Sequence, residues 1–231
     1  MPKPAFYDLF IDIQEEHIED VLLFSKHLGY KGIGINLRNE DIKDIRQIET
    51  KLINLAKETN IDICFRTPYD VVKKLNVNRD ELKTLFSIIY IDVKTRKDFE
   101  SALKNPYINI ISLQIDIFSN IISQELINLL LQRPDKLLEI RLSKILKVNA
   151  PERASILYSL YRKIDLLRKP AFKFIISSQA ESLTEMISPR MLRSFLRILG
   201  LKEEKILEAI SLLPSRIIKQ PWPIIIQKIE G

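Results

Sequence analysis

Short apolar runs alternate with longer amphipathic stretches along the whole chain. The runs are nearly continuous in apolar residues, as is typical of strands that are covered on both faces. The stretches between them place apolar side chains at helical spacing, for example at Ile42, Ile45, Ile48 and Leu52. We predict strands at residues 5–12, 32–36, 61–66, 87–93, 108–113, 137–142 and 173–178.

Helices are predicted between these strands, and several carry end signals. Proline is favoured at the first helical position, and in this chain it follows Asn149-Ala150 and Ser188. Gly29 and Gly200 are placed where helices are expected to end. The predicted helices cover residues 15–29, 41–59, 69–75, 79–85, 95–104, 122–132, 149–168, 188–199 and 202–213.

Seven strand-helix units follow one another without a Gly/Ser-rich or Pro-rich spacer, so we predict one domain over residues 1–231. Strands that are separated by helices form parallel sheets. Seven such units favour an α/β fold, a TIM-barrel-like arrangement of about seven parallel strands with surrounding helices. A doubly wound open sheet is the alternative. Residues 219–231 are predicted to be irregular or to form a short strand, which either folds onto the barrel or docks a partner.

Composition excludes several classes of protein. Cys64 is the only cysteine, which rules out an intrachain disulfide and a four-cysteine zinc site. The five glycines form neither a dinucleotide-binding fingerprint nor a P-loop. No apolar run approaches the roughly 20 residues of a membrane span, and no signal peptide is recognised at the N-terminus. We therefore expect a cytoplasmic protein without a membrane partner.

The net charge of +6 is unevenly distributed. Residues 1–132 carry 17 Lys and Arg and 20 Asp and Glu, which gives −3. Residues 133–231 carry 19 and 10, which gives +9. A basic half indicates an anionic partner such as nucleic acid, or simply a solvated basic surface.

The strand ends, where a barrel places its chemistry, lack a catalytic constellation. The only histidines, His17 and His27, fall in the first predicted helix, and we expect neither to reach a strand mouth. Cys64 lies in the middle of a strand, and no G-x-S-x-G is present. Carboxylates at the strand ends offer a minor alternative, a Mg²⁺ site made without histidine. These residues are Asp8, Asp12, Asp92 and Asp116.

What the strand ends do carry is positive charge. Each of these cations alone is more typical of a solvated surface, but their recurrence on several loops favours phosphate-backbone binding. Hydroxyl groups at the end of the last strand, and an arginine in the first turn of the helix after it, add possible phosphate ligands. The predicted RNA-binding residues are Arg38, Arg66, Lys94, Arg96, Lys97, Arg141, Lys144, Ser177, Ser178 and Arg190. Pairing with Glu185 is the alternative role of Arg190.

Between residues 139 and 190 the chain resembles a known family. The segments are EIRLSKIL, APERASILYSLYRKIDLLRK, KFIISSQA and SPRMLRSFLRILGL, and the opening FYDLFID fits as well. They resemble the thirty-kilodalton protein family of ribonuclease P, known in archaea as component three. The resemblance implies a barrel related to polymerase-and-histidinol-phosphatase-type phosphoesterases, which begin D-x-H-x-H. Here Phe10 and Asp12 stand where those histidines would be.

The resemblance also implies a function. Members bind the catalytic RNA of ribonuclease P together with a small ferredoxin-like protein subunit, as an expected heterotetramer with two copies of each. The RNA and its Mg²⁺ then remove the 5′ leader from precursor tRNA, so the protein is expected to hold no cofactor and to be inactive alone. The alternatives are a free-standing barrel phosphoesterase or isomerase, and a scaffold that binds only proteins.

Overall fold

Seven parallel strands form one sheet in the order β1-β2-β3-β4-β5-β6-β7 in the computed structural model of the chain. The structure describes residues 4–12, 17–38, 42–75 and 78–219. Every expected strand forms, with ends that shift by up to two residues. The strands are β1 (Phe6–Ile11), β2 (Tyr30–Asn36), β3 (Asp62–Pro68), β4 (Ile88–Asp92), β5 (Ile110–Gln114), β6 (Leu137–Arg141) and β7 (Phe174–Ser177).

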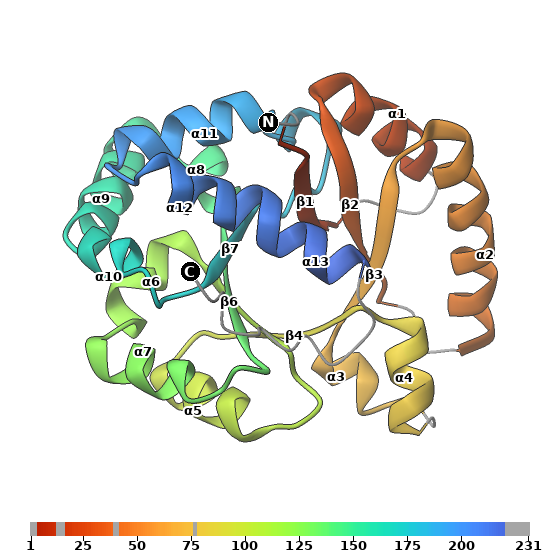
Figure 1. Cartoon of the computed structure of the whole chain (residues 1–231), viewed down its shortest axis with the longest axis horizontal. Helices are drawn as coiled ribbons and strands as arrows, with labels where there is room; N and C mark the ends of the chain where they lie inside the picture. The colour runs from red at the N-terminus through yellow and green to blue at the C-terminus, as the bar shows by residue number, and fades with distance from the viewer. Residues whose placement is uncertain (1–3, 13–16, 39–41, 76–77, 220–231) are drawn as a thin grey trace.

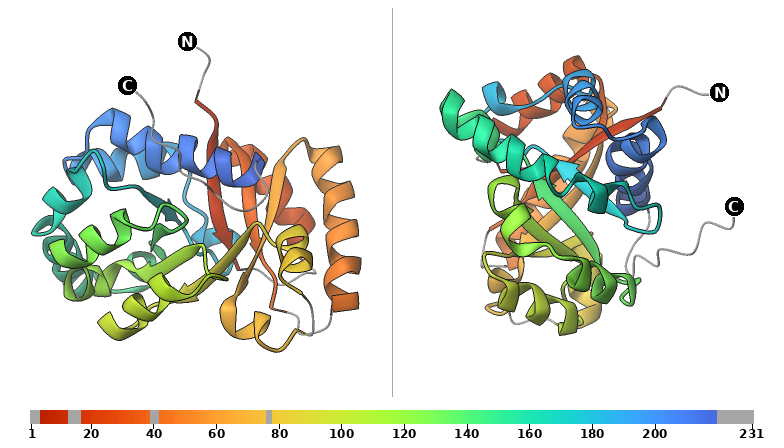
Figure 2. Two further views of the ribbon diagram at one scale, coloured as in Figure 1. Left: turned by 60° about the horizontal axis from the view of Figure 1, so that its bottom comes forward. Right: turned by 90° about the vertical axis from the view of Figure 1, so that its left-hand side faces the viewer.

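The sheet curls into a nearly closed barrel with helices around its outside (Figure 1, Figure 2). β1 meets the segment that follows β7 through a parallel bridge between Ile11 and Ala180. The Asp12 amide donates to the Ala180 carbonyl at 2.8 Å, and the Ser178 amide donates to the Asp8 carboxylate at 3.1 Å. This seam confirms the barrel and excludes the open doubly wound sheet.

Most helices lie where the pattern predicts them. The first eight are α1 (Ile18–Leu28), α2 (Ile42–Thr59), α3 (Tyr69–Val72), α4 (Arg79–Leu85), α5 (Arg96–Lys104), α6 (Ile115–Ile121), α7 (Gln124–Leu131) and α8 (Ser143–Lys147). The others are α9 (Ala150–Tyr161), α10 (Ile164–Arg168), η2 (Leu183–Glu185), α11 (Pro189–Ile198), α12 (Glu203–Leu207), η3 (Glu208–Leu212) and α13 (Leu213–Lys219). Among the described helices, none is long and apolar enough to cross a membrane.

The expected end signals act as predicted. The Asn149 and Ser188 side chains accept hydrogen bonds from the Glu152 and Met191 amides, which caps α9 and α11. Gly29 ends α1 and Gly200 follows the end of α11, and their φ angles are +92° and +86°. At Gly200 a Cβ atom would also collide with the Arg168 guanidinium.

Three helical predictions were wrong in detail. The expected helix at 122–132 begins only after Ser123, which is extended and caps α7, and a separate helix α6 precedes it. The expected helix at 149–168 breaks after Tyr161, because the chain turns there before Ile164 and Leu167 pack into the core. Helix α8 was not predicted. The final helix runs past residue 213 to Lys219, whereas residues 220–231, with the possible extra strand, lie outside the described residues.

The barrel interior is layered from apolar to polar along the strands. Side chains at alternate positions point inward, and at the amino ends of the strands they are apolar. Leu213 and Ile217 of α13 join this layer, and Figure 1 shows α13 lying across the ring of strands. On β2 the inward positions are Gly32 and Gly34, where a Cβ atom would collide with the backbone of β3 and β1 respectively. The opposite end of the barrel, at the carboxyl ends of the strands, is polar, and we call it the mouth.

Candidate nucleic-acid interface at the barrel mouth

A buried ion pair fills the centre of the barrel below its mouth. Arg66 from β3 and Glu139 from β6 are both fully buried and form two hydrogen bonds of 2.8 Å. Ser112 and Ser177 also donate to the Glu139 carboxylate. Burial raises the pKa of Glu139, but the Arg66 guanidinium and these hydrogen bonds outweigh it and hold the pKa below its ordinary value.

Aromatic rings enclose the Arg66 guanidinium. Its carbon atom lies 3.6 Å from the centre of the Phe10 ring and 4.3 Å from that of the Tyr90 ring. Arg66 also donates to the Leu9 carbonyl at 2.6 Å. Within the described residues, no three His, Cys, Asp or Glu side chains come together as a metal site would require. Phe10, which the resemblance places at a histidine position of the phosphoesterase motif, packs against the Arg66 guanidinium.

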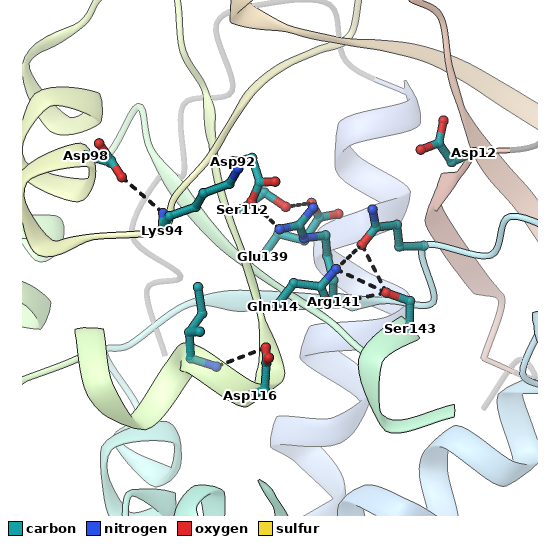
Figure 3. Close-up of polar contacts among 12 residues, drawn as sticks. Asp12, Asp92, Lys94, Asp98, Ser112, Gln114, Asp116, Glu139, Arg141 and Ser143 are labelled. Atoms are coloured by element: carbon teal, nitrogen blue, oxygen red, sulfur yellow. Dashed lines mark hydrogen bonds and ion pairs between the residues drawn. The ribbon is translucent and has the colours of Figure 1, made fainter. Parts of the chain in front are cut away.

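A polar ring lies above this pair, at the carboxyl ends of the strands (Figure 3). Arg141 forms an ion pair with Asp92, and Gln114 donates to Ser143 at 3.1 Å and to Gln179 at 2.5 Å. Gln179 has a φ of +54°, which is uncommon for a residue other than glycine. These contacts form two sets: one links β4 with β6, and the other links β5 with α8 and the segment that follows β7.

Four of the ten predicted RNA-binding residues are buried, which corrects the expectation that they stand on the rim. Arg66 and Ser177 are completely inaccessible and engage Glu139. Arg141 is 2% exposed and pairs with Asp92, and Ser178 is 3% exposed beside Asp8. Their polar atoms hold the barrel together, so we remove them from the proposed RNA surface.

Five predicted cations do surround the mouth on several loops. Lys94, Arg96 and Lys97 are exposed between β4 and the first turn of α5. Arg96 pairs with Glu100 and Glu125 at 2.8 Å, the first of them on its own helix. Two further residues, Arg38 and Lys144, pair with Asp12 and with Glu152, the second pair at 3.6 Å. These exposed pairs contribute little to folding, and the cations stay accessible to phosphate.

Arg190 is exposed in the first turn of α11. The alternative partner, Glu185, is engaged elsewhere: its carboxylate accepts from the Glu181 amide at 2.9 Å and lies 3.5 Å from Lys147. Among the described residues, no ion pair of Arg190 is found. Its guanidinium therefore lies beside a helix N-terminus without a carboxylate partner.

The histidines lie differently from each other. His27 is exposed on α1 and stacks on Phe24 with ring centres 6.3 Å apart, away from the mouth as expected. His17 lines a hollow beside Asp12 at the end of β1, so the expectation that it stays away from a strand mouth was wrong. The reason is that His17 is the N-cap residue of α1 and follows Ile11, the last residue of β1, by only six positions.

Sequence reasoning missed Glu139, Gln114 and Gln179 as members of the mouth. The signal for Glu139 was present, because a charged residue in the apolar segment LLEIRL requires a buried partner. Its partner comes from three strands away. Nothing in the sequence indicates the backbone conformation of Gln179.

Comparisons with known proteins decide what this barrel is. The model of the family described as RNase P subunit p30 matches residues 5–221. The chain belongs to this family. RNase P subunit p30 proteins are subunits of the endoribonuclease complex that processes the 5′ end of tRNA, so the chain is an RNase P protein subunit and the resemblance found in the sequence is confirmed.

Two relatives of this RNase P subunit come from species of Methanosarcina. Ribonuclease P protein component 3 of Methanosarcina barkeri is 24% identical over 226 residues, covering 96% of this chain and 92% of the relative. The component 3 protein of Methanosarcina mazei is 23% identical with the same coverage. Both alignments span the whole barrel.

Solved structures agree on the architecture. A chain in the cryo-EM structure of archaeal Ribonuclease P with mature tRNA superposes with a TM-score of 0.69 at 19% identity, covering 92% of this chain and 89% of that one. Dihydroorotase from Campylobacter jejuni superposes with a TM-score of 0.56 at 10% identity, covering 95% and 84%. At these identities the likeness shows the fold alone, a TIM-like barrel.

Proposed function

We propose that this RNase P subunit binds the catalytic RNA through exposed cations around the barrel mouth, and that the RNA and its Mg²⁺ cleave the precursor tRNA. One observation carries the proposal: cations from four connecting segments remain accessible at the mouth, whereas the interior is occupied by the Arg66–Glu139 pair. The residues assigned to the RNA surface are Arg38, Lys94, Arg96, Lys97, Lys144 and Arg190. The solved relative that contains mature tRNA supports RNA and tRNA as partners.

The salt dependence of RNA binding tests this assignment. Contacts to about four to six phosphates give a log–log slope of roughly −3 to −5 for affinity against salt concentration. Binding of purified protein to ribonuclease P RNA is measured at several salt concentrations. A flat response excludes the backbone-contact account.

The protein alone is proposed to cleave nothing. Support comes from the centre of the barrel, where Phe10 and the Arg66–Glu139 pair occupy the space below the strand ends. Protein freed of RNA is incubated with precursor tRNA and with simple phosphoesters in the presence of divalent metals. Robust cleavage by the protein alone favours the free-standing phosphoesterase instead.

A protein partner is proposed on a different face. Tyr158 and Tyr161 of α9 are 65% and 58% exposed, and Met191 and Ile198 of α11 are 64% and 83% exposed. Exposed Tyr, Met and Ile side chains are typical of interface cores before a partner covers them. We assign this face to the small ferredoxin-like subunit, within a cytoplasmic heterotetramer of two copies of each chain.

The assignment is tested by mass measurement of the mixed subunits in solution. Ile198→Glu is expected to weaken the complex at least tenfold, because a charge enters the apolar contact. Leu23→Glu, at a side chain that is 53% exposed on α1, is the matched control and leaves assembly intact. Equal losses in both variants place the partner elsewhere.

A further inference from the structure

A hollow of about 830 Å³ opens at the mouth, between the ends of β1 and β2 and the segment that follows β7. This volume is within the range of small-molecule sites. Its walls present Asp12, His17, Arg38, Glu181, Ser182 and Thr184. Figure 3 shows Asp12 apart from the Gln114–Ser143 network, on another side of the mouth.

The walls are held in place before any ligand arrives. The Asp12 carboxylate accepts from the Asn36 amide at 2.8 Å and pairs with Arg38. Lys147 lies 2.7 Å from the Glu181 carboxylate and fixes it to the end of α8. On the same segment the Ser182 and Thr184 hydroxyls lie 3.0 Å apart. A preformed wall of this kind lowers the entropy cost of binding.

Among the described residues that line the hollow, Asp12, Arg38 and Glu181 each have a partner of opposite charge. Arg38 is matched by Asp12, and Glu181 is matched by Lys147. The rim also carries Lys94, Lys97 and Arg190, for which no ion pair is found among the described residues. Arg38 and Lys147 both have a carboxylate partner, so the hollow favours a neutral base more than the rim does. Carboxylate, hydroxyl and planar side chains are instead the groups that recognise base edges and ribose hydroxyls.

We propose that this hollow binds one unstacked guanine nucleotide by its base and ribose. Among the described residues, Asn36 and Arg38 use two of the about four acceptor positions of the Asp12 carboxylate. Guanine presents two adjacent donors, N1–H and the N2 amino group, which suit a carboxylate. The planar groups of Arg38 and His17 suit the base faces, and the Ser182 and Thr184 hydroxyls suit the ribose. The nucleotide is either a unit of RNA, in which case the site deepens the proposed function, or a free mononucleotide.

The experiment is an NMR titration of ¹⁵N-labelled full-length protein with GMP, AMP, CMP and UMP. GMP is expected to bind at least fivefold more tightly than the other three, and to shift amides at the ends of β1 and β2 and in residues 178–185. Asp12→Asn is expected to weaken GMP binding at least tenfold. Asp92→Asn is the matched control, because Asp92 also pairs with an arginine at a strand end yet does not line the hollow.

A competition experiment between GMP and RNA shows whether the site takes a nucleotide unit of RNA or a free mononucleotide. If saturating GMP displaces a guanine-containing segment of ribonuclease P RNA, the site takes a unit of RNA. If GMP and the RNA bind independently, it takes a free nucleotide. The absence of shifts with all four nucleotides at millimolar concentration, or equal weakening in both aspartate variants, overturns the proposal. If the nucleotide proposal is overturned but RNA binding still depends steeply on salt, the proposed function is retained.

Discussion

Arg66 and Lys97 are both cations near the carboxyl ends of strands in the same barrel, yet one is fully buried and the other is exposed. Arg66 has a bidentate carboxylate partner and two aromatic rings against its guanidinium. Lys97 lies on the surface in the first turn of α5. A cation that is neutralised inside the barrel stabilises the fold, whereas an exposed cation keeps its field available to phosphate. Position along the chain alone does not distinguish the two roles.

The largest effect is expected from Glu139→Gln. The substitution keeps the shape but leaves the Arg66 charge buried without a counter-ion. Removing one partner of a buried pair costs about 3–5 kcal/mol of the free energy of unfolding. Urea unfolding measures it, and the double variant Arg66→Met/Glu139→Leu is expected to recover part of the loss.

The control for Glu139→Gln is Glu152→Gln, because Glu152 pairs with Lys144 at 3.6 Å on the surface. Exposed pairs contribute at most about 1 kcal/mol. If Glu139→Gln is no more harmful than Glu152→Gln, the central pair does not carry the stability assigned to it.

Asp8 is also buried, but unlike Arg66 it has no ion-pair partner among the described residues. Burial raises its pKa to about 6, against hydrogen bonds from Ser178 and Phe10 that lower it. The folded pKa therefore lies above the unfolded value of 3.8, so the contribution of Asp8 to stability is full at low pH and is lost as pH rises through 6. The shift corresponds to about 3 kcal/mol between pH 4 and pH 8.

Asp8→Asn is expected to remove this pH dependence, because an amide stays neutral and its oxygen still accepts from the Ser178 and Phe10 amides. The variant is predicted to be more stable than the parent at pH 8 and about equal at pH 4. Urea unfolding at both pH values measures the difference. A parent protein that gains stability between pH 4 and pH 8 relative to Asp8→Asn contradicts the assignment.

The order and the parallel direction of the strands followed from the sequence, because apolar runs and helical spacing are local properties. Burial at the mouth did not follow, since it depends on which residues meet across the barrel. Arg66 and Ser177 each stand at a strand end, which predicts a place on the rim. Their side chains instead point into the barrel, where both donate hydrogen bonds to Glu139 on β6. The break after Tyr161 precedes Ile164 and Leu167, whose burial in the core also depends on tertiary contacts.

The exposed side of the comparison is tested by Lys94→Ala/Lys97→Ala. Loss of two phosphate contacts is expected to make the log–log salt slope of RNA binding less negative by about 1.4 to 1.8, and to weaken binding roughly tenfold at 0.1 M salt. Thermal stability stays the same. Lys104→Ala is the matched control, because Lys104 is exposed at the opposite end of α5, away from the mouth. Similar slopes in both variants would remove this loop from the RNA surface.

The smallest effect is expected from Arg190→Ala. A cation in the first turn of α11 opposes the positive end of the helix dipole, so its removal leaves the melting temperature unchanged or slightly raised. The same position suits a phosphate, which the guanidinium and the Arg190 amide can bind together, whereas the Met191 amide donates to the Ser188 side chain. Activity of reconstituted ribonuclease P is predicted to fall several-fold, mostly at low Mg²⁺. Arg197→Ala, at the other end of α11 and paired with Glu203, is the control and keeps full activity. If Arg190→Ala loses stability and retains activity, Arg190 stabilises the fold, as Arg66 does, and does not bind RNA.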